Sequence, residues 1–181
     1  TIDRIDFSSE TVSLPGPSLT ENRHHLAAVS NSNYGYFGGG STSTYFCTID
    51  RIDFSTETVA GPPVHGANLT QARDSLGAVS GGKSINAKGF KKHKTDISGN
   101  PISKSYGYFA GGFAPPNVCT IDRLDFSSET VAVPPVGQQL PDARNAHAGL
   151  SNPNYGYFGG GSSPGYGATI DRIDFSNETT S

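Results

Sequence analysis

The octapeptide Thr-Ile-Asp-Arg-Ile-Asp-Phe-Ser occupies residues 48–55 and occurs four times in the chain. The other copies begin at Thr1, Thr120 and Thr169, and the copy at Thr120 has Leu124 in place of one isoleucine. Successive copies begin 47, 72 and 49 residues apart. Self-similarity at roughly 20–50 residues is the signature of repeat architectures. The 181-residue chain is therefore a repeat array.

Three further segments recur around the octapeptide, which we term segment c. Segment a is small and apolar and follows an arginine, as in Leu-Ala-Ala-Val at 26–29. Segment b is Tyr-Gly-Tyr-Phe-Gly-Gly-Gly at 34–40 and 155–161, with Ala110 at one glycine position of the copy at 106–112. Segment d is a short Thr-Val stretch that follows a polar turn. Four short strands in about 47 residues match a propeller blade, and the absence of a long 3.6-residue apolar period argues against helical repeats.

The repeat resembles the kelch type of β-propeller repeat, in which an arginine precedes the first strand and a Gly-Gly doublet closes the second. Gly38 lies 15 residues after Arg23, and Gly159 lies 15 residues after Arg144. The resemblance implies an all-β fold, a kelch-like β-propeller segment of four-stranded antiparallel blades. The amino-acid sequences of segments b and c also resemble repeats in tail-associated structural proteins of marine bacteriophages.

One feature departs from the kelch pattern. The family's Tyr-Asp…Trp pair corresponds here to Ile5-Asp6 and Val12, and the chain contains no tryptophan. The outer strand is therefore expected to be less well anchored than in the family.

The repeats divide the chain into three blades and a remainder. Residues 1–17 form an orphan c-d strand pair, and the blades are 18–64, 65–136 and 137–181. Propellers typically have four to eight blades, and an unpaired strand edge invites association. We therefore expect either a segment of a longer array, which the absence of methionine favours, or ends that pair with another copy as a homo-oligomer.

The second repeat carries a basic insertion at 81–104. All six lysines of the chain lie in it: Lys83, Lys88, Lys91, Lys92, Lys94 and Lys104. Its net charge of +5 offsets −8 in the remaining chain to give −3 overall. Such a segment can hold anionic glycans, with Lys88, Lys91, Lys92 and Lys94 as candidate ligand-binding residues. With Phe90 as its only aromatic residue it lacks the stacking platform of a nucleic-acid groove. A solvated hairpin without a ligand and a foreign segment are the alternatives.

Charged residues recur in every repeat, which favours a structural role over a catalytic one. Seven arginines occupy repeat positions: Arg4, Arg51, Arg123 and Arg172 in segment c, and Arg23, Arg73 and Arg144 before segment a. We expect the segment c arginines and their flanking aspartates to form Asp–Arg ladders between neighbouring strands or blades. In the turn that follows, Ser8, Ser9 and Thr11 are expected to bond backbone groups.

Other reactive residues form no recognisable centre. His24 and His25 are adjacent and would point to opposite faces of a strand, so they are poorly placed to share a metal. Cys47 and Cys119 occupy equivalent positions on neighbouring sheets, about 10 Å apart, which exceeds the roughly 7 Å limit for a disulfide. We therefore expect free thiols, no metal, no cofactor and no enzymatic activity.

The loops between segments b and c differ completely from one repeat to the next, at 41–46, 113–118 and 162–167. Variable loops on a repeated scaffold commonly form a binding surface. The candidate ligand-binding aromatic residues there are Tyr45, Phe46, Phe113 and Tyr166. Ordinary loop drift without a ligand is the alternative.

The expected function is a non-enzymatic structural or adhesive module, extracellular or in a virion tail or fibre. Its expected partners are surface glycans or other virion or cell-surface proteins, and not nucleic acid. No apolar run approaches the roughly 18–20 residues of a membrane-spanning helix. An intracellular protein–protein interaction propeller is the first alternative. A propeller-type copper oxidase is the second, although its Tyr/Cys/His ligand set has no evident counterpart here.

Overall fold

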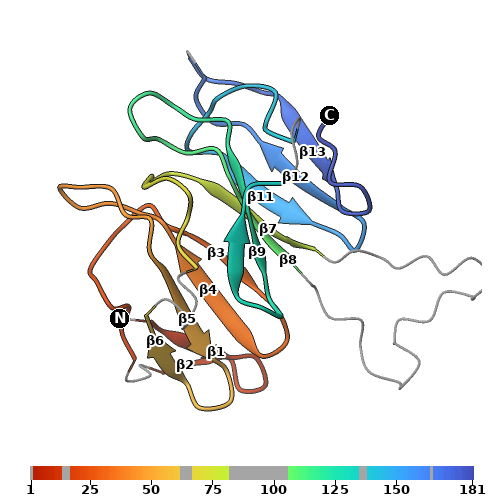
Figure 1. The fold of residues 1–181 in the computed structure, drawn as a ribbon. Helices are drawn as coiled ribbons and strands as arrows, with labels where there is room; N and C mark the ends of the chain where they lie inside the picture. Colours follow the sequence, from red (N-terminus) through yellow and green to blue (C-terminus); the bar gives the residue numbers. More distant parts are fainter. Residues whose placement is uncertain (1, 14–16, 62–66, 82–105, 135–137, 164) are drawn as a thin grey trace, which may run out of the picture.

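The computed structural model describes residues 2–13, 17–61, 67–81, 106–134, 138–163 and 165–181. Every regular element within these ranges is a β-strand, and every strand pair is antiparallel (Figure 1). The predicted all-β class is confirmed. The described part of the chain has no helix that is long and apolar enough to cross a membrane.

The strands form four sheets, each drawn from one repeat. An N-terminal strand pair consists of β1 (Arg4–Asp6) and β2 (Thr11–Ser13). The first sheet contains β3 (Ala27–Ser30), β4 (Tyr34–Gly38), β5 (Ile49–Asp53) and β6 (Thr58–Ala60). The second sheet contains β7 (Gly77–Gly81), β8 (Tyr106–Ala110), β9 (Ile121–Asp125) and β10 (Thr130–Ala132). The third sheet contains β11 (Ala148–Ser151), β12 (Tyr155–Gly159) and β13 (Ile170–Asp174).

The third sheet has three strands where the repeat predicts four. Its segment d reads Thr179-Thr180 instead of the Thr-Val of the other repeats. Thr180 forms an isolated bridge with Ile173, and the backbones of Arg172 and Ser181 exchange two hydrogen bonds. The fourth segment therefore pairs with β13 over too short a stretch to form a strand.

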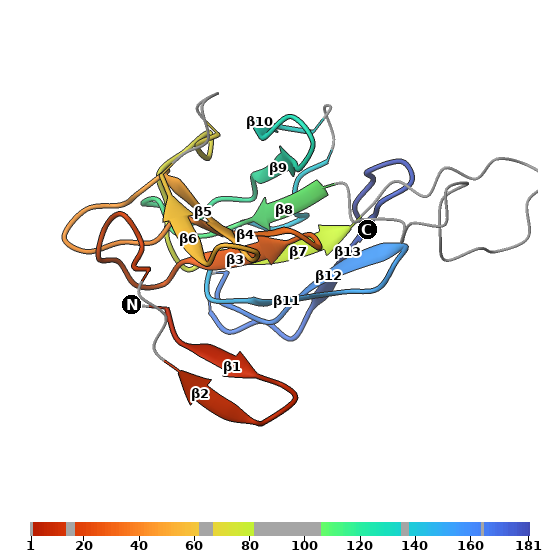
Figure 2. The same ribbon diagram turned by 90° about the horizontal axis from the view of Figure 1, so that it is seen from below.

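The sheets approach one another through their first strands. Contacts between different sheets run mainly from β7 to β3 on one side and to β11 and β12 on the other. Figure 2 shows the second sheet running outward from β7 to β10, away from this meeting point. Successive sheets are therefore close at their first strands and spread apart at their last.

Two apolar clusters fill the spaces between successive sheets. The first contains Val29 and Tyr36 of the first sheet with Phe109 and Phe126 of the second-sheet repeat. The second lies between the second and third sheets. It contains Val79 and Tyr108 of the second sheet with Phe158, Ile173 and Phe175 of the third repeat. The core of the molecule is therefore made at junctions between repeats, and no sheet buries its faces alone.

Glycines in segment b allow the sheets to approach closely. A Cβ atom at Gly107 would lie 2.5 Å from a methyl group of Val29, and one at Gly156 would lie 2.6 Å from a methyl group of Val79. The glycines after the strand also require unusual backbone angles, with φ of 70° at Gly39 and 101° at Gly40. Positive φ and close backbone contact are the two situations that favour glycine. The glycines of segment b are therefore required by the backbone geometry and by the close approach of the sheets.

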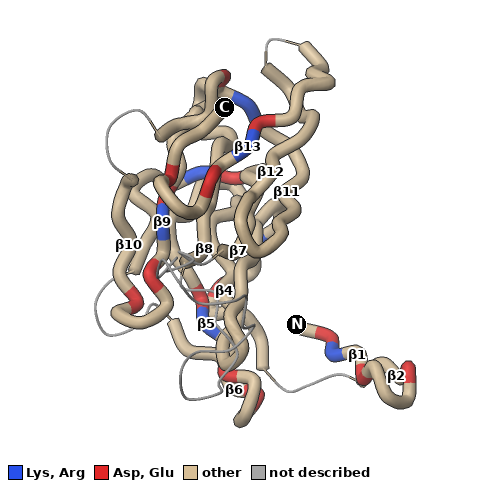
Figure 3. The backbone as a smooth tube through the Cα atoms, turned by 90° about the vertical axis from the view of Figure 1, so that its right-hand side faces the viewer, with Lys and Arg blue, Asp and Glu red and all other residues tan. Residues whose placement is uncertain are grey.

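The N-terminal strand pair projects from the three sheets (Figures 2 and 3). Phe7 is 88% exposed, and Ile5 and Val12 are also largely exposed. Arg4 of this strand pair forms an ion pair with Glu57 of the first sheet's repeat.

Candidate functional site

Each sheet is tied together by a buried ion pair between an arginine before its first strand and an aspartate in its third strand. Arg23 bonds Asp50, and Arg73 bonds Asp122, both at 3.0 Å and with fully buried side chains. The backbone N–H and the hydroxyl of Thr20 also donate to Asp50, and Thr70 donates to Asp122 in the same way. Buried charges need such partners, because an unpaired buried ion is costly.

The third sheet has the same ion pair with fewer partners. Arg144 lies 2.8 Å from Asp171, but Pro141 occupies the position of Thr20 and Thr70. Proline has no N–H and no hydroxyl to donate. Burial raises the pKa of the Asp171 carboxyl above its usual value, although Arg144 opposes the shift. The aspartate of the third sheet therefore lacks the two threonine hydrogen bonds that the other two aspartates accept.

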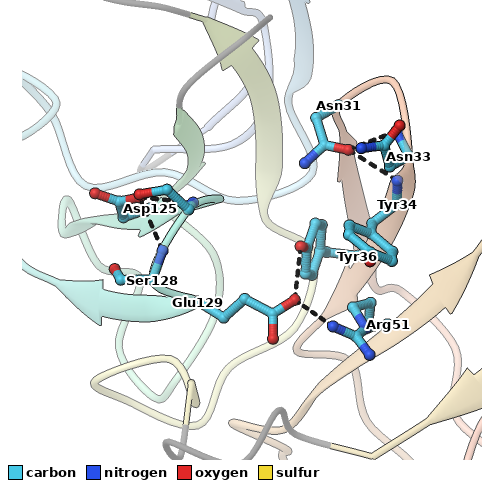
Figure 4. A network of polar contacts seen from close by, with 9 residues as sticks. Asn31, Asn33, Tyr34, Tyr36, Arg51, Asp125, Ser128 and Glu129 are labelled. Atoms are coloured by element: carbon cyan, nitrogen blue, oxygen red, sulfur yellow. Dashed lines mark hydrogen bonds and ion pairs between the residues drawn. The ribbon is translucent and has the colours of Figure 1, made fainter.

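A second set of polar contacts joins one sheet to the next. Glu129, in the turn after β9, accepts hydrogen bonds from the guanidinium of Arg51 at 2.6 Å and from the hydroxyl of Tyr36 at 3.0 Å (Figure 4). Phe126 stacks on the ring of Tyr36 with centroids 5.2 Å apart. Burial, and then the nearby carboxylate, raise the pKa of Tyr36 far above its usual value. Tyr36 thus stays protonated and donates to Glu129.

The next junction repeats the same geometry. Glu178 accepts from Arg123 at 2.7 and 2.8 Å and from the hydroxyl of Tyr108 at 3.0 Å. Phe175 stacks on Tyr108 with centroids 5.4 Å apart. Each junction therefore combines a face half, made by a tyrosine and an arginine, with a turn half, made by a phenylalanine and a glutamate of the following repeat.

The glutamate of the turn half sits in an unfavourable backbone conformation in all four repeats. Glu10, Glu57, Glu129 and Glu178 have φ between 53° and 60°. Non-glycine residues seldom adopt this region, and when they do a functional reason is worth seeking. The conformation belongs to the turn itself, which the N–H groups of Glu57 and Glu178 close by donating to the carbonyls of Asp53 and Asp174. It also places Glu129 and Glu178 against the preceding sheet.

Two expectations about the segment c repeat are corrected by these contacts. The arginines of segment c do not form ladders with their flanking aspartates, because Arg4, Arg51 and Arg123 bind turn glutamates instead. Asp6 does not join a ladder either, since its carboxylate accepts from the N–H groups of Ser8 and Ser9 and from the Ser8 hydroxyl. These bonds lower the pKa of Asp6. The turn is therefore organised by its aspartate. The prediction that Ser8, Ser9 and Thr11 bond backbone groups is wrong, because the Ser8 hydroxyl donates to Asp6 and the hydroxyls of Ser9 and Thr11 bond each other.

Figure 3 shows the alternation of charge along β1, β5, β9 and β13 from which the ladder was inferred. Alternating residues of one strand face opposite neighbours. The first aspartate consequently meets the arginine before β3, β7 or β11, while the arginine next to it faces the following repeat. The turn glutamates were missed because a glutamate in a polar turn has the sequence pattern of a solvated residue. Their recurrence in all four turns was the available signal.

The loops between the second and third strands bring some of the predicted aromatic residues together. Tyr45 of the first loop meets Phe113 of the second edge to face, with ring centroids 5.8 Å apart. Asn117 of the second loop donates to the carbonyl of Ser162 in the third at 2.9 Å. Tyr166 is fully exposed. We call Tyr45, Phe113 and Tyr166 the loop rim.

Phe46 does not belong to this exposed set. Its ring is half-buried beside the guanidinium of Arg23, with 6.0 Å from the central carbon to the ring centroid. Its carbonyl accepts the backbone N–H of Arg73 at 3.1 Å, which helps to join the first sheet to the second. Phe46 therefore packs within the scaffold. The predicted Lys88, Lys91, Lys92 and Lys94 lie outside the described residues.

His147 is a buried histidine that the sequence did not single out. It occupies the position of Leu26 and Leu76, and its ring lies against Phe158 with centroids 5.8 Å apart. Burial, with a smaller effect of the nearby positive charge of Arg144, lowers the pKa of His147 to about 4. The ring is therefore neutral at physiological pH.

The remaining reactive groups are dispersed. Cys47 and Cys119 are free thiols, as predicted. The rings of His24 and His25 lie 4.4 Å apart, and His25 lies 3.7 Å from Asp74. Within the described ranges, no three histidine, cysteine, aspartate or glutamate side chains are placed together as metal ligands.

The geometry thus offers repeated junctions and one variable loop rim. No protein-family model and no curated protein sequence matches the chain.

Proposed function

We propose that this chain is an arc of a kelch-like β-propeller that serves as a non-enzymatic structural or adhesive module. The loop rim contacts surface glycans or a partner protein, in an extracellular or virion setting such as a phage tail or fibre. The observation that carries the proposal is the contrast between near-identical sheets and entirely different loops with exposed aromatic residues.

The arrangement of the sheets supports the propeller. Three consecutive sheets have the same antiparallel order and the same register, in which Tyr36, Tyr108 and Tyr157 lie opposite Arg51, Arg123 and Arg172. Their first strands are close together and their last strands spread apart, as in the blades of a propeller.

The loop rim supports an adhesive role. Tyr45 and Phe113 come from neighbouring repeats and touch, and Tyr166 extends from the next loop in the series. Exposed aromatic faces are suited to stacking on the apolar faces of sugars. Several weak contacts on one rigid scaffold increase total affinity when they are engaged together.

A glycan array with the intact protein tests this function, with Tyr45→Ala and Tyr166→Ala combined as the variant. We expect the wild type to bind a subset of glycans and the variant to lose at least about tenfold in affinity, which corresponds to roughly 1.4 kcal/mol. Phe54→Ala is the matched control, because Phe54 is an exposed aromatic residue outside the loop rim. If no glycan and no cell-surface protein binds at any salt concentration, the adhesive role is wrong.

A further inference from the structure

The two internal junctions use the same four side chains in the same way. At each of them, a tyrosine and an arginine of one sheet receive a phenylalanine and a glutamate of the following repeat. The glutamate to arginine distances are 2.6 Å and 2.7 Å, and the aromatic centroid distances are 5.2 Å and 5.4 Å. In both junctions the same two types of face residue therefore bind the same two types of turn residue.

The third sheet presents a face half that nothing in the described part of the chain covers. Tyr157 and Arg172 occupy the positions of Tyr108 and Arg123. Arg172 is exposed and forms no ion pair with a carboxylate among the described residues, and its guanidinium lies 4.8 Å from the ring centroid of Tyr155. Around it, Leu150 is 67% exposed and Ile170 is 69% exposed.

The N-terminal strand pair presents the complementary turn half, also uncovered. Phe7 occupies the position of Phe126 and Phe175, and its side chain is 88% exposed. Glu10 is exposed and forms no ion pair within the described ranges, yet it has the same backbone conformation as Glu129 and Glu178, with φ of 54°. Glu10 therefore has the backbone conformation of the junction glutamates but no arginine partner among the described residues.

We propose that the outer face of the third sheet binds the Phe7–Glu10 turn of a second copy of this chain. Glu10 pairs with Arg172 of the other copy and accepts from the hydroxyl of Tyr157, while Phe7 stacks on the Tyr157 ring. The charges are opposite, and the interface continues the one that the chain makes twice internally. The binding surfaces are different on the two partners, so association is head to tail and produces a closed ring or a filament.

This inference goes beyond the adhesive function and does not depend on it, since the loop rim is not part of the interface. It also provides a partner for the exposed apolar side chains of Leu150 and Ile170. Exposed apolar patches of this kind commonly mark interaction sites.

Sedimentation velocity across a concentration series, up to the solubility limit, tests the proposal with charge-reversed variants. The wild type should associate with increasing concentration. Glu10→Arg alone and Arg172→Glu alone should each weaken association by about tenfold or more, because each places like charges at the contact. A mixture of the two single variants, and the double variant, should regain association because opposite charges face each other again.

Glu21→Arg is the control for net charge, since Glu21 is exposed and forms no ion pair in the described ranges. It should associate like the wild type. Arg172 and Glu10 are both exposed, so the variants should fold, which circular dichroism would verify. A wild type that is monomeric at every concentration overturns the proposal. So do single variants that associate as strongly as the wild type.

Discussion

The second and third sheets have nearly the same sequence but very different surroundings. Both faces of the second sheet are covered, one by the first sheet and the other by the third. Val79 and Ile121 of the second sheet are 3% and 0% exposed, whereas the equivalent Leu150 and Ile170 of the third are mostly exposed. The same repeat position is thus core in one sheet and surface in the other. Burial in this molecule is decided by the neighbouring repeat, because a single sheet cannot bury its own faces.

The largest expected difference between the two sheets comes from their equivalent tyrosines. Tyr108→Ala removes a fully buried ring that stacks on Phe175 and donates to Glu178, so we expect a loss of about 3–5 kcal/mol in the free energy of unfolding. Tyr157→Ala removes a half-buried ring without such a stack and should cost less than about 1 kcal/mol in dilute protein. Urea denaturation measures both, and equal losses would show that the two faces are equally covered.

The second expected difference is a dependence of stability on pH that comes from His147. Its pKa is about 4 in the folded protein, against about 6.5 when unfolded, so the unfolded state binds more protons between these values. Stability should therefore fall as the pH is lowered from about 6.5 to about 4, by up to about 3 kcal/mol.

His147→Leu is the sharpest comparison, because leucine already occupies this position in the first and second repeats. The variant should lose this part of the pH dependence while other titrating groups remain. Thermal unfolding of both proteins across the range from pH 4 to 7 measures the difference. Identical pH profiles would show that His147 is not buried in neutral form.

A smaller effect is expected from the turn glutamates. Glu178→Gln weakens charge-assisted bonds to Arg123 and Tyr108, and should cost about 1–3 kcal/mol. Glu10→Gln removes a charge that has no partner in the described part of the chain, and should change the stability of dilute protein by less than about 0.5 kcal/mol. Chemical denaturation of the two variants checks this order, and a reversal would contradict the assignment of Glu178 to the junction.

The smallest expected effect is a gain in stability. Pro141→Thr places in the third sheet the threonine that donates twice to the aspartate in the first and second. Two hydrogen bonds at about 1 kcal/mol each, less about 0.4–1 kcal/mol for the lost rigidity of proline, give a net gain of about 1 kcal/mol. The midpoint of thermal unfolding should rise, and an unchanged or lower midpoint would show that Asp171 is already satisfied.

The repeated segments were sufficient to predict the all-β class and the antiparallel strands, apart from the fourth strand that the third sheet lacks. Gly39 and Gly40, which end segment b, have positive φ values that only glycine adopts freely. The ion-pair partners of the charged residues could not be predicted from the sequence. Arg51 lies between two aspartates in the sequence but faces Glu129, which is 78 residues away and belongs to another sheet.

The solvent exposure of the third sheet's outer face also could not be predicted from the sequence pattern. Tyr108 and Tyr157 stand in the same sequence context, and their difference lies only in which repeat packs against them. Likewise, Phe46 and Tyr45 are adjacent aromatic residues of a variable loop. The first packs beside Arg23 and the second reaches Phe113 of the next loop.

Tyrosine nitration mapped by mass spectrometry tests most directly whether neighbouring repeats bury equivalent residues unequally. In dilute native protein, Tyr36 and Tyr108 should resist modification, while Tyr157 should react and Tyr166 should react fastest. At high protein concentration Tyr157 should become protected from nitration, because the outer face of the third sheet binds a second copy. Tyr166 should remain reactive. Equal reactivity of Tyr108 and Tyr157 in dilute protein would contradict the stacking of the sheets.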